Sequence, residues 1–168
     1  MKKTKQFEDY LDKGATFIAA VAFVVMVALI SLNVILRYLI NTSVNWAEEV
    51  AYLCFNWTVF MGVAIVYRHQ GLITIDLIVD RLQGRVKKAI LIGGYAIVSL
   101  MNLGLIIWGT EFSVVAWQRK SNILHIPYFF YDISIPLAAV LLLIYSSTFL
   151  LQTIRNEELE NTALEDRV

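Results

Sequence analysis

Four charged side chains stand at the ends of long apolar segments. Arg37 closes the first segment, Glu48 and Glu49 open the second, and Glu111 lies near the end of the third. Charges are costly beside hydrocarbon, so such a group requires an explanation. The charges could form an active site, or they could form ion pairs, because the planar guanidinium of arginine holds two carboxylate oxygens at once.

The spacing at the start of the second segment favours a structural role for Glu48. Asn45 and Glu48 fit the Asx-x-x-Glu pattern of a helix capping box, which satisfies free N–H groups at a helix start. The helix dipole also favours glutamates in a first turn. We therefore predict a structural layer of caps and ion pairs, anchored by one tryptophan and formed by Arg37, Trp46, Glu48, Glu49 and Glu111.

The equipment of an enzyme is missing from the sequence. His69 and His125 are the only two histidines and are expected on opposite sides of the membrane, which rules out paired-histidine haem ligation. Cys54 is the only cysteine, so no disulfide can form within the chain. No HExxH, CxxC or glycine-rich phosphate-binding motif is present. The sequence predicts that the chain is not an enzyme and holds no metal or cofactor of its own.

The elements that carry these residues are membrane spans. The chain has 168 residues, of which 58% are hydrophobic and 17% charged, and its mean hydropathy is +0.64. About 20 apolar residues cross a bilayer as a helix. Four segments qualify, and they predict an all-α integral membrane protein built as a single membrane domain over residues 1–168, with spans at 14–36, 46–67, 89–110 and 133–154.

The distribution of basic residues predicts the orientation of the spans. Eleven of the 14 Lys and Arg residues precede the first span, follow the fourth, or lie between the second and third, and only Arg37, Arg119 and Lys120 fall on the other side. Lys and Arg accumulate on the cytoplasmic side. Both termini should therefore be cytoplasmic in a bacterial inner membrane, and the predicted layer of charges should face outward.

Two segments outside the spans have their own signatures. Residues 72–82 show apolar residues at helical spacing over about three turns, which predicts a short amphipathic helix in the cytoplasmic interface between the second and third spans. A loop with a strand-like beginning is the alternative. Residues 155–168 are polar and rich in charge, so we expect a frayed or disordered tail.

The centres of the spans lack the ionisable residues that mark a substrate path. Their deepest polar residues are Asn56 and Asn102, and amides at such depths usually bond to a neighbouring helix. We expect contacts with a partner subunit at Asn56, Asn102 and Gly62. Pore lining by Asn56 or Asn102 is the alternative.

The stretches NVILRYLINTSVNWAEEVAYL, FMGVAIVYR and GLITIDLI resemble the small membrane subunit of tripartite ATP-independent periplasmic (TRAP) transporters. The likeness covers most of residues 30 to 82. One departure is visible, because Leu72 stands where the family often has histidine. The matching positions are an Arg-aromatic pair, a Trp-x-Glu-Glu motif, a glycine and an aspartate: Arg37, Tyr38, Trp46, Glu48, Glu49, Gly62 and Asp76.

The resemblance implies a function that depends on partners. Such subunits pair with a large membrane subunit that holds the sodium and substrate sites, and a periplasmic substrate-binding protein delivers an organic acid such as a C4-dicarboxylate, sialic acid or another sugar acid. The chain would act as a scaffold surrounded by membrane lipids, with no nucleic-acid partner. Contacts with the periplasmic protein are expected at Arg119, Lys120 and His125. A self-contained four-helix exporter or channel that acts as an oligomer is the alternative function.

Overall fold

The computed structural model describes residues 2–42, 44–69 and 85–165, and most of these residues are helical. The long helices are α1 (Lys2–Ile40), α2 (Asn45–Arg68), α4 (Arg85–Val115) and α6 (Ser134–Glu165). A 3₁₀ turn, η1 (Ala116–Gln118), and a short helix, α5 (Phe129–Asp132), lie between α4 and α6. Each long helix contains a segment apolar and long enough to cross a membrane. The prediction of an all-α protein with four spans is confirmed.

The helices extend beyond the predicted spans. Helix α1 has 39 residues, which gives it a length of about 58 Å at 1.5 Å per residue. The tail expected to fray is different in the structure, because α6 continues as a helix to Glu165. Its apolar part and its polar end form one uninterrupted helix. Residues 155–165 contain neither proline nor glycine, the two residues that most disfavour a helix interior. The predicted interfacial helix at 72–82 lies outside the described residues.

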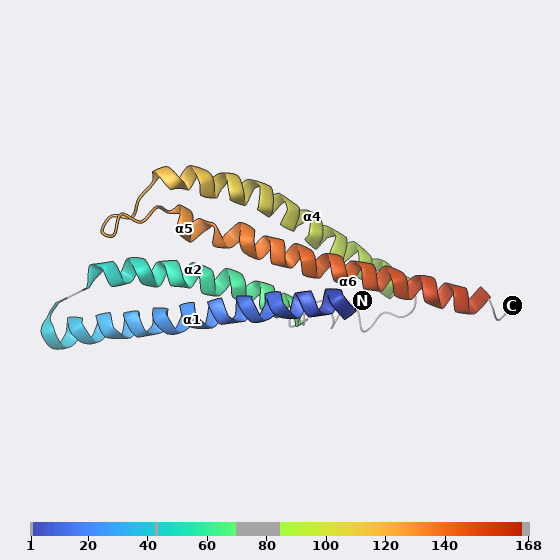
Figure 1. Cartoon of the computed structure of the whole chain (residues 1–168), viewed down its shortest axis with the longest axis horizontal. Coiled ribbons are helices and arrows are strands. Elements are labelled where there is room, and N and C mark those ends of the chain that lie inside the picture. The colour runs from blue at the N-terminus through green and yellow to red at the C-terminus, as the bar shows by residue number, and fades with distance from the viewer. Residues whose placement is uncertain (1, 43, 70–84, 166–168) are drawn as a thin grey trace.

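The four long helices lie side by side in the order α1, α2, α6, α4 (Figure 1). Helix α1 packs against α2, α2 against α6, and α6 against α4. The connections 41–44 and 116–133 lie together at one end of the molecule, which we call the loop end. The start of α1, the end of α6 and Arg68 at the end of α2 lie toward the other end, which we call the terminal end.

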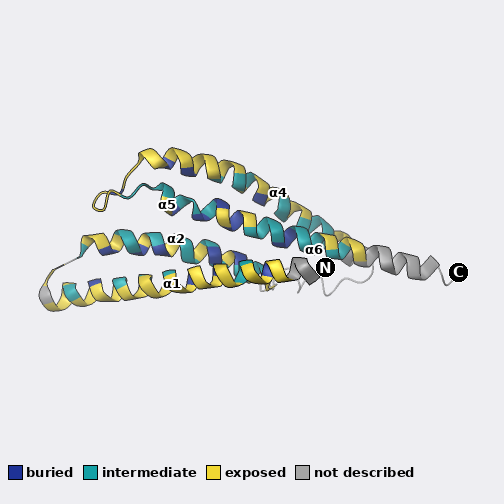
Figure 2. Cartoon of the chain, viewed as in Figure 1, coloured by how far each residue is buried: buried dark blue, intermediate teal, exposed yellow. Residues whose placement is uncertain are grey.

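Small residues make the contacts between neighbouring helices. The core joins Ala15 and Ala19 of α1 to Met61 of α2, and Ala138 and Ala139 of α6 are also buried. Small side chains let helix backbones approach closely where lipid gives no hydrophobic drive for association. Most large apolar side chains point outward instead, so exposed surface dominates α1 and α4 (Figure 2). The row of helices therefore offers broad apolar faces to its surroundings.

Candidate functional site

The loop end contains an ion pair between the first two helices. The Nη2 atom of Arg37, in the last turn of α1, lies 3.2 Å from Oε1 of Glu48 in the first turn of α2. Both side chains are well exposed, at 58% and 63%. Solvent weakens such a pair to less than about 1 kcal/mol. The pair thus aligns α1 with α2 without dominating the stability of the hairpin.

Asn33 supports this pair from a buried position that sequence reasoning missed. Its Nδ2 donates to Oε1 of Glu48 at 3.2 Å, and its Oδ1 accepts from the backbone N–H of Val44 at 2.9 Å. The side chain therefore bonds both the carboxylate and the backbone of the connection. The sequence does contain a signal for this role, because Asn33 lies one helical turn before Arg37 and therefore on the same face of α1.

The predicted capping box at the start of α2 is wrong. The N-cap is Val44, no side chain caps the helix, and the N–H of Ala47 bonds to the Val44 carbonyl at 3.0 Å. Asn45 thus lies within the first turn. Glu48 does not reach back to cap the helix, because its Oε1 is held by Asn33 and Arg37 of α1.

Glu49 has a different partner from Glu48. Its two carboxylate oxygens accept from the backbone N–H groups of Ile123 and Leu124, each at 2.9 Å. Its backbone carbonyl accepts from the hydroxyl of Tyr131 at 3.3 Å. Glu49 therefore anchors the connection between α4 and α6, more than 70 residues away, to the first turn of α2.

The remaining members of the predicted layer stand apart. Trp46 is 46% exposed in the first turn of α2. Glu111 is exposed on α4 and belongs to none of the ion pairs within the described part of the chain. It lies one turn before the end of α4 that leads to the loop end, but α4 packs against α6, at the opposite edge of the row from α1, which separates Glu111 from Arg37.

The residues expected to touch a periplasmic protein share one exposed hairpin. Arg119, Lys120 and His125 are exposed, and an isolated β-bridge pairs Lys120 with Pro127. His125 has a positive φ of 55°, and its Nδ1 lies 3.0 Å from the carbonyl oxygen of Ile123. The hairpin presents its two cations at the loop end.

The three residues expected at a partner subunit have different surroundings. Asn56 and Gly62 are partly exposed on α2, and a side chain at Gly62 would meet nothing within 4 Å. Asn102 is only 4% exposed, and its amide donates to the Val98 carbonyl of its own helix at 2.8 Å. Asn102 therefore faces the interior of this chain, and its contact with a partner subunit stays a prediction.

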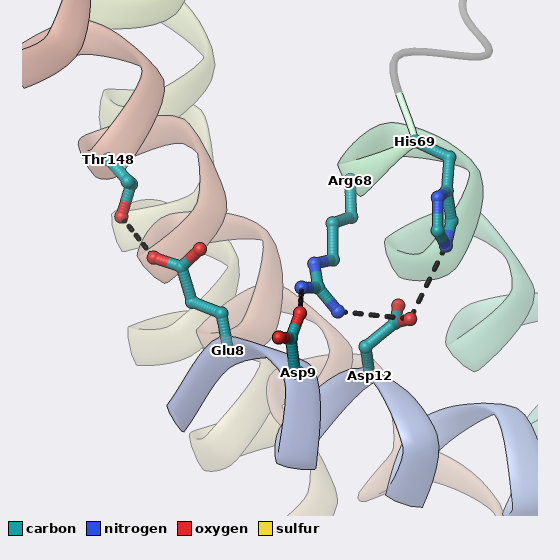
Figure 3. A network of polar contacts seen from close by, with 6 residues as sticks. All are labelled: Glu8, Asp9, Asp12, Arg68, His69 and Thr148. Atoms are coloured by element: carbon teal, nitrogen blue, oxygen red, sulfur yellow. Dashed lines mark hydrogen bonds and ion pairs between the residues drawn. The ribbon is translucent and has the colours of Figure 1, made fainter. Parts of the chain in front are cut away.

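A second polar cluster at the terminal end joins α1, α2 and α6 (Figure 3). Arg68 at the end of α2 bonds the carboxylates of Asp9 and Asp12 on α1, the latter at 3.0 Å. Oδ2 of Asp12 also lies 3.3 Å from Nε2 of His69. Thr148 of α6 donates to Oε1 of Glu8 at 2.7 Å. We call these six residues the terminal network: Glu8, Asp9, Asp12, Arg68, His69 and Thr148.

The terminal network is less accessible to water than the pair at the loop end. The side chains of Arg68 and Asp12 are 16% and 14% exposed, and the Arg68 guanidinium lies 5.6 Å from the centroid of the Tyr145 ring. The sequence analysis gave no structural role to His69, Glu8, Asp9 or Asp12. The i, i+4 spacing of Glu8 and Asp12 was the available signal for a polar stripe on α1.

Four helices that can each cross a bilayer, with polar groups bonded at both ends, define a multi-pass membrane protein. The sequence profile of the family described as "Tripartite ATP-independent periplasmic transporters, DctQ component" matches residues 26–156. The chain belongs to this family, the small permease subunits of TRAP transporters.

Relatives agree with this assignment. A Haemophilus influenzae protein provisionally named TRAP transporter small permease protein is 30% identical over 83 residues, 49% of this chain and 50% of the relative. The C4-dicarboxylate TRAP transporter small permease protein DctQ of Vibrio cholerae is 26% identical over 123 residues, 70% of this chain and 52% of the relative. The chain spans about half the length of the curated relatives it matches.

We predict that Asn33 contributes more to stability than the ion pair it supports. Asn33→Ala leaves the Val44 N–H without its acceptor and should lower the free energy of unfolding in detergent by about 1 kcal/mol. The matched variant Arg37→Ala should cost less than about 0.5 kcal/mol, because the pair is exposed. Denaturant unfolding followed by circular dichroism measures both. A larger loss for Arg37→Ala would contradict the assignment.

Proposed function

We propose that the chain is a non-catalytic scaffold subunit of a sodium-coupled TRAP transporter that imports an organic acid. It would pair with the large membrane subunit, which would hold the sodium and substrate sites. Its place would be the bacterial inner membrane, with both termini in the cytoplasm, as the distribution of Lys and Arg favours. A periplasmic protein would deliver a C4-dicarboxylate, sialic acid or another sugar acid.

The observation that carries this proposal is the position of the charges in a protein of this family. Residues 14–36, 50–67, 89–110 and 133–154 contain no charged side chain, and the ion pairs Arg37–Glu48 and Arg68–Asp12 lie at opposite ends of the helices. A carboxylate substrate crossing within this chain would meet no cation between the two ends. A scaffold requires only the ordered helices and their apolar faces.

The geometry also favours particular surfaces for the two protein partners. Gly62 and Asn56 lie on α2 with space around the glycine, so α2 offers a place for a helix of the large subunit to approach closely. Arg119, Lys120 and His125 are exposed on the hairpin at the loop end, where we place contact with the periplasmic protein.

The decisive experiment compares the chain alone with the complete system in liposomes. The chain alone should take up neither labelled succinate nor labelled sialic acid under an inward sodium gradient. Uptake of one organic acid should appear only when the large subunit and the periplasmic protein are added, and the chain should co-purify with the large subunit. Uptake by the chain alone would instead establish a self-contained transporter.

A further inference from the structure

A cavity of about 400 Å³ opens at the loop end, between the first two turns of α2 and the connection from α4 to α6. Its walls combine polar and aromatic side chains with two carboxylates. Neither the proposed scaffold role nor the organic acid accounts for it. The lining residues are Asn45, Glu48, Glu49, Tyr52, Ser121, Asn122, Ile123, Tyr128 and Tyr131.

Three tyrosine rings form one side of this cavity. The Tyr131 ring centroid lies 5.8 Å from that of Tyr52 and 5.3 Å from that of Tyr128, with ring planes inclined by 33° and 42°. Tyr131 is buried, and its hydroxyl donates to the Glu49 carbonyl, so its position is fixed. Tyr52 is 55% exposed at the opening. Aromatic faces attract cations within about 6 Å of the ring centroid.

The charges of the cavity have one sign. Its lining includes Glu48 and Glu49 and no basic residue. Glu48 is paired with Arg37. Glu49 is held by the N–H groups of Ile123 and Leu124, which fix the carboxylate but bring no formal positive charge. The cavity therefore keeps a negative charge beside its tyrosine rings, and it would repel an organic acid.

We propose that this cavity binds an alkylammonium group, held by the Glu49 carboxylate and by the tyrosine rings. The ring faces would contact the N-methylene or N-methyl carbons, and the carboxylate would balance the charge. The cavity lies where the candidate span of α2 begins, which is the depth of lipid headgroups. The group can come from the ethanolamine of an aminophospholipid or from a free amine, and the two sources share this chemistry.

Substitutions at the exposed Tyr52 test the proposal and leave the buried Tyr131 and its bond to Glu49 in place. Tyr52→Leu removes an exposed ring and keeps an apolar side chain, whereas Tyr52→Phe keeps the ring. Tyr38→Leu is the matched control. Tyr38 is 81% exposed in the last turn of α1, also at the loop end, but it does not line the cavity. Helical content by circular dichroism should be equal in all variants.

The lipid arm uses native mass spectrometry of the chain in uncharged detergent with equal amounts of phosphatidylethanolamine and phosphatidylglycerol. We expect preferential retention of phosphatidylethanolamine, reduced about fivefold by Tyr52→Leu and unchanged by Tyr52→Phe and Tyr38→Leu. The free-amine arm titrates the chain with tetramethylammonium or ethylammonium chloride against sodium chloride at equal ionic strength, with binding followed by saturation-transfer NMR.

The two arms separate the sources and decide the proposal. Retention of phosphatidylethanolamine that depends on the Tyr52 ring assigns the site to a lipid headgroup. Binding of the soluble amines with the same dependence, but no lipid preference, assigns it to a free amine. The proposal is overturned if neither probe binds, if phosphatidylglycerol is retained equally and no amine binds, or if binding is the same in Tyr52→Leu as in Tyr52→Phe.

Discussion

Replacement of Arg68 by methionine is expected to lower the free energy of unfolding of the chain in detergent by about 3 kcal/mol. Arg68 bonds Asp9 and Asp12 and lies over the Tyr145 ring. Methionine keeps much of the apolar stem but leaves the largely buried Asp12 carboxylate without its strongest cation. Removing one partner of such a pair costs more than the pair contributes, because the other charge stays desolvated.

Two further variants make this expectation specific to the terminal network. Arg119→Met removes an exposed arginine that has a similar ring contact, 5.6 Å from the Phe112 centroid, but belongs to none of the ion pairs among the described residues. It should change stability by less than about 1 kcal/mol. Asp12→Asn added to Arg68→Met should restore part of the loss, since it removes the stranded charge. Equal losses for Arg68→Met and Arg119→Met would show that the network does not hold α1 to α2.

The terminal network also illustrates what the sequence could not predict. The four spans follow from local composition, because any run of about 20 apolar residues crosses a bilayer as a helix. The partners of Arg68 lie 56 and 59 residues away on α1, and hydropathy contains no information on which helices are neighbours. The order α1, α2, α6, α4 decides that Asp12 meets Arg68 and that Glu111 stays away from Arg37.

The adjacent residues Glu48 and Glu49 also show that the sequence alone does not identify the partners of a side chain. Both were expected in one layer with Arg37, and their type and position gave no reason to separate them. In the structure, Glu48 turns to α1 and Glu49 to the connection between α4 and α6. Neighbouring helix residues point about 100° apart, so each contacts a different element, and only the packing of the helices identifies it.

Glu49→Ala is expected to accelerate hydrogen exchange at the amides of Ile123 and Leu124 at least about tenfold. Both amides donate to the Glu49 carboxylate at 2.9 Å, and hydrogen bonds to an ionised acceptor are stronger than neutral ones. Glu48→Ala is the matched control, because Glu48 bonds Asn33 and Arg37 instead. It should leave both exchange rates unchanged.

Two backbone amides at the base of the hairpin are internal controls in the same experiment. The backbone N–H of Ser121 donates to the Ile126 carbonyl, and the backbone N–H of Tyr128 donates to the Arg119 carbonyl, each at 2.9 Å. These two amides should keep their protection in Glu49→Ala, while the tip around His125 with its positive φ is released. Loss of protection at all four amides would mean that Glu49 holds the whole hairpin. Unchanged exchange at Ile123 and Leu124 would mean that the hairpin holds itself.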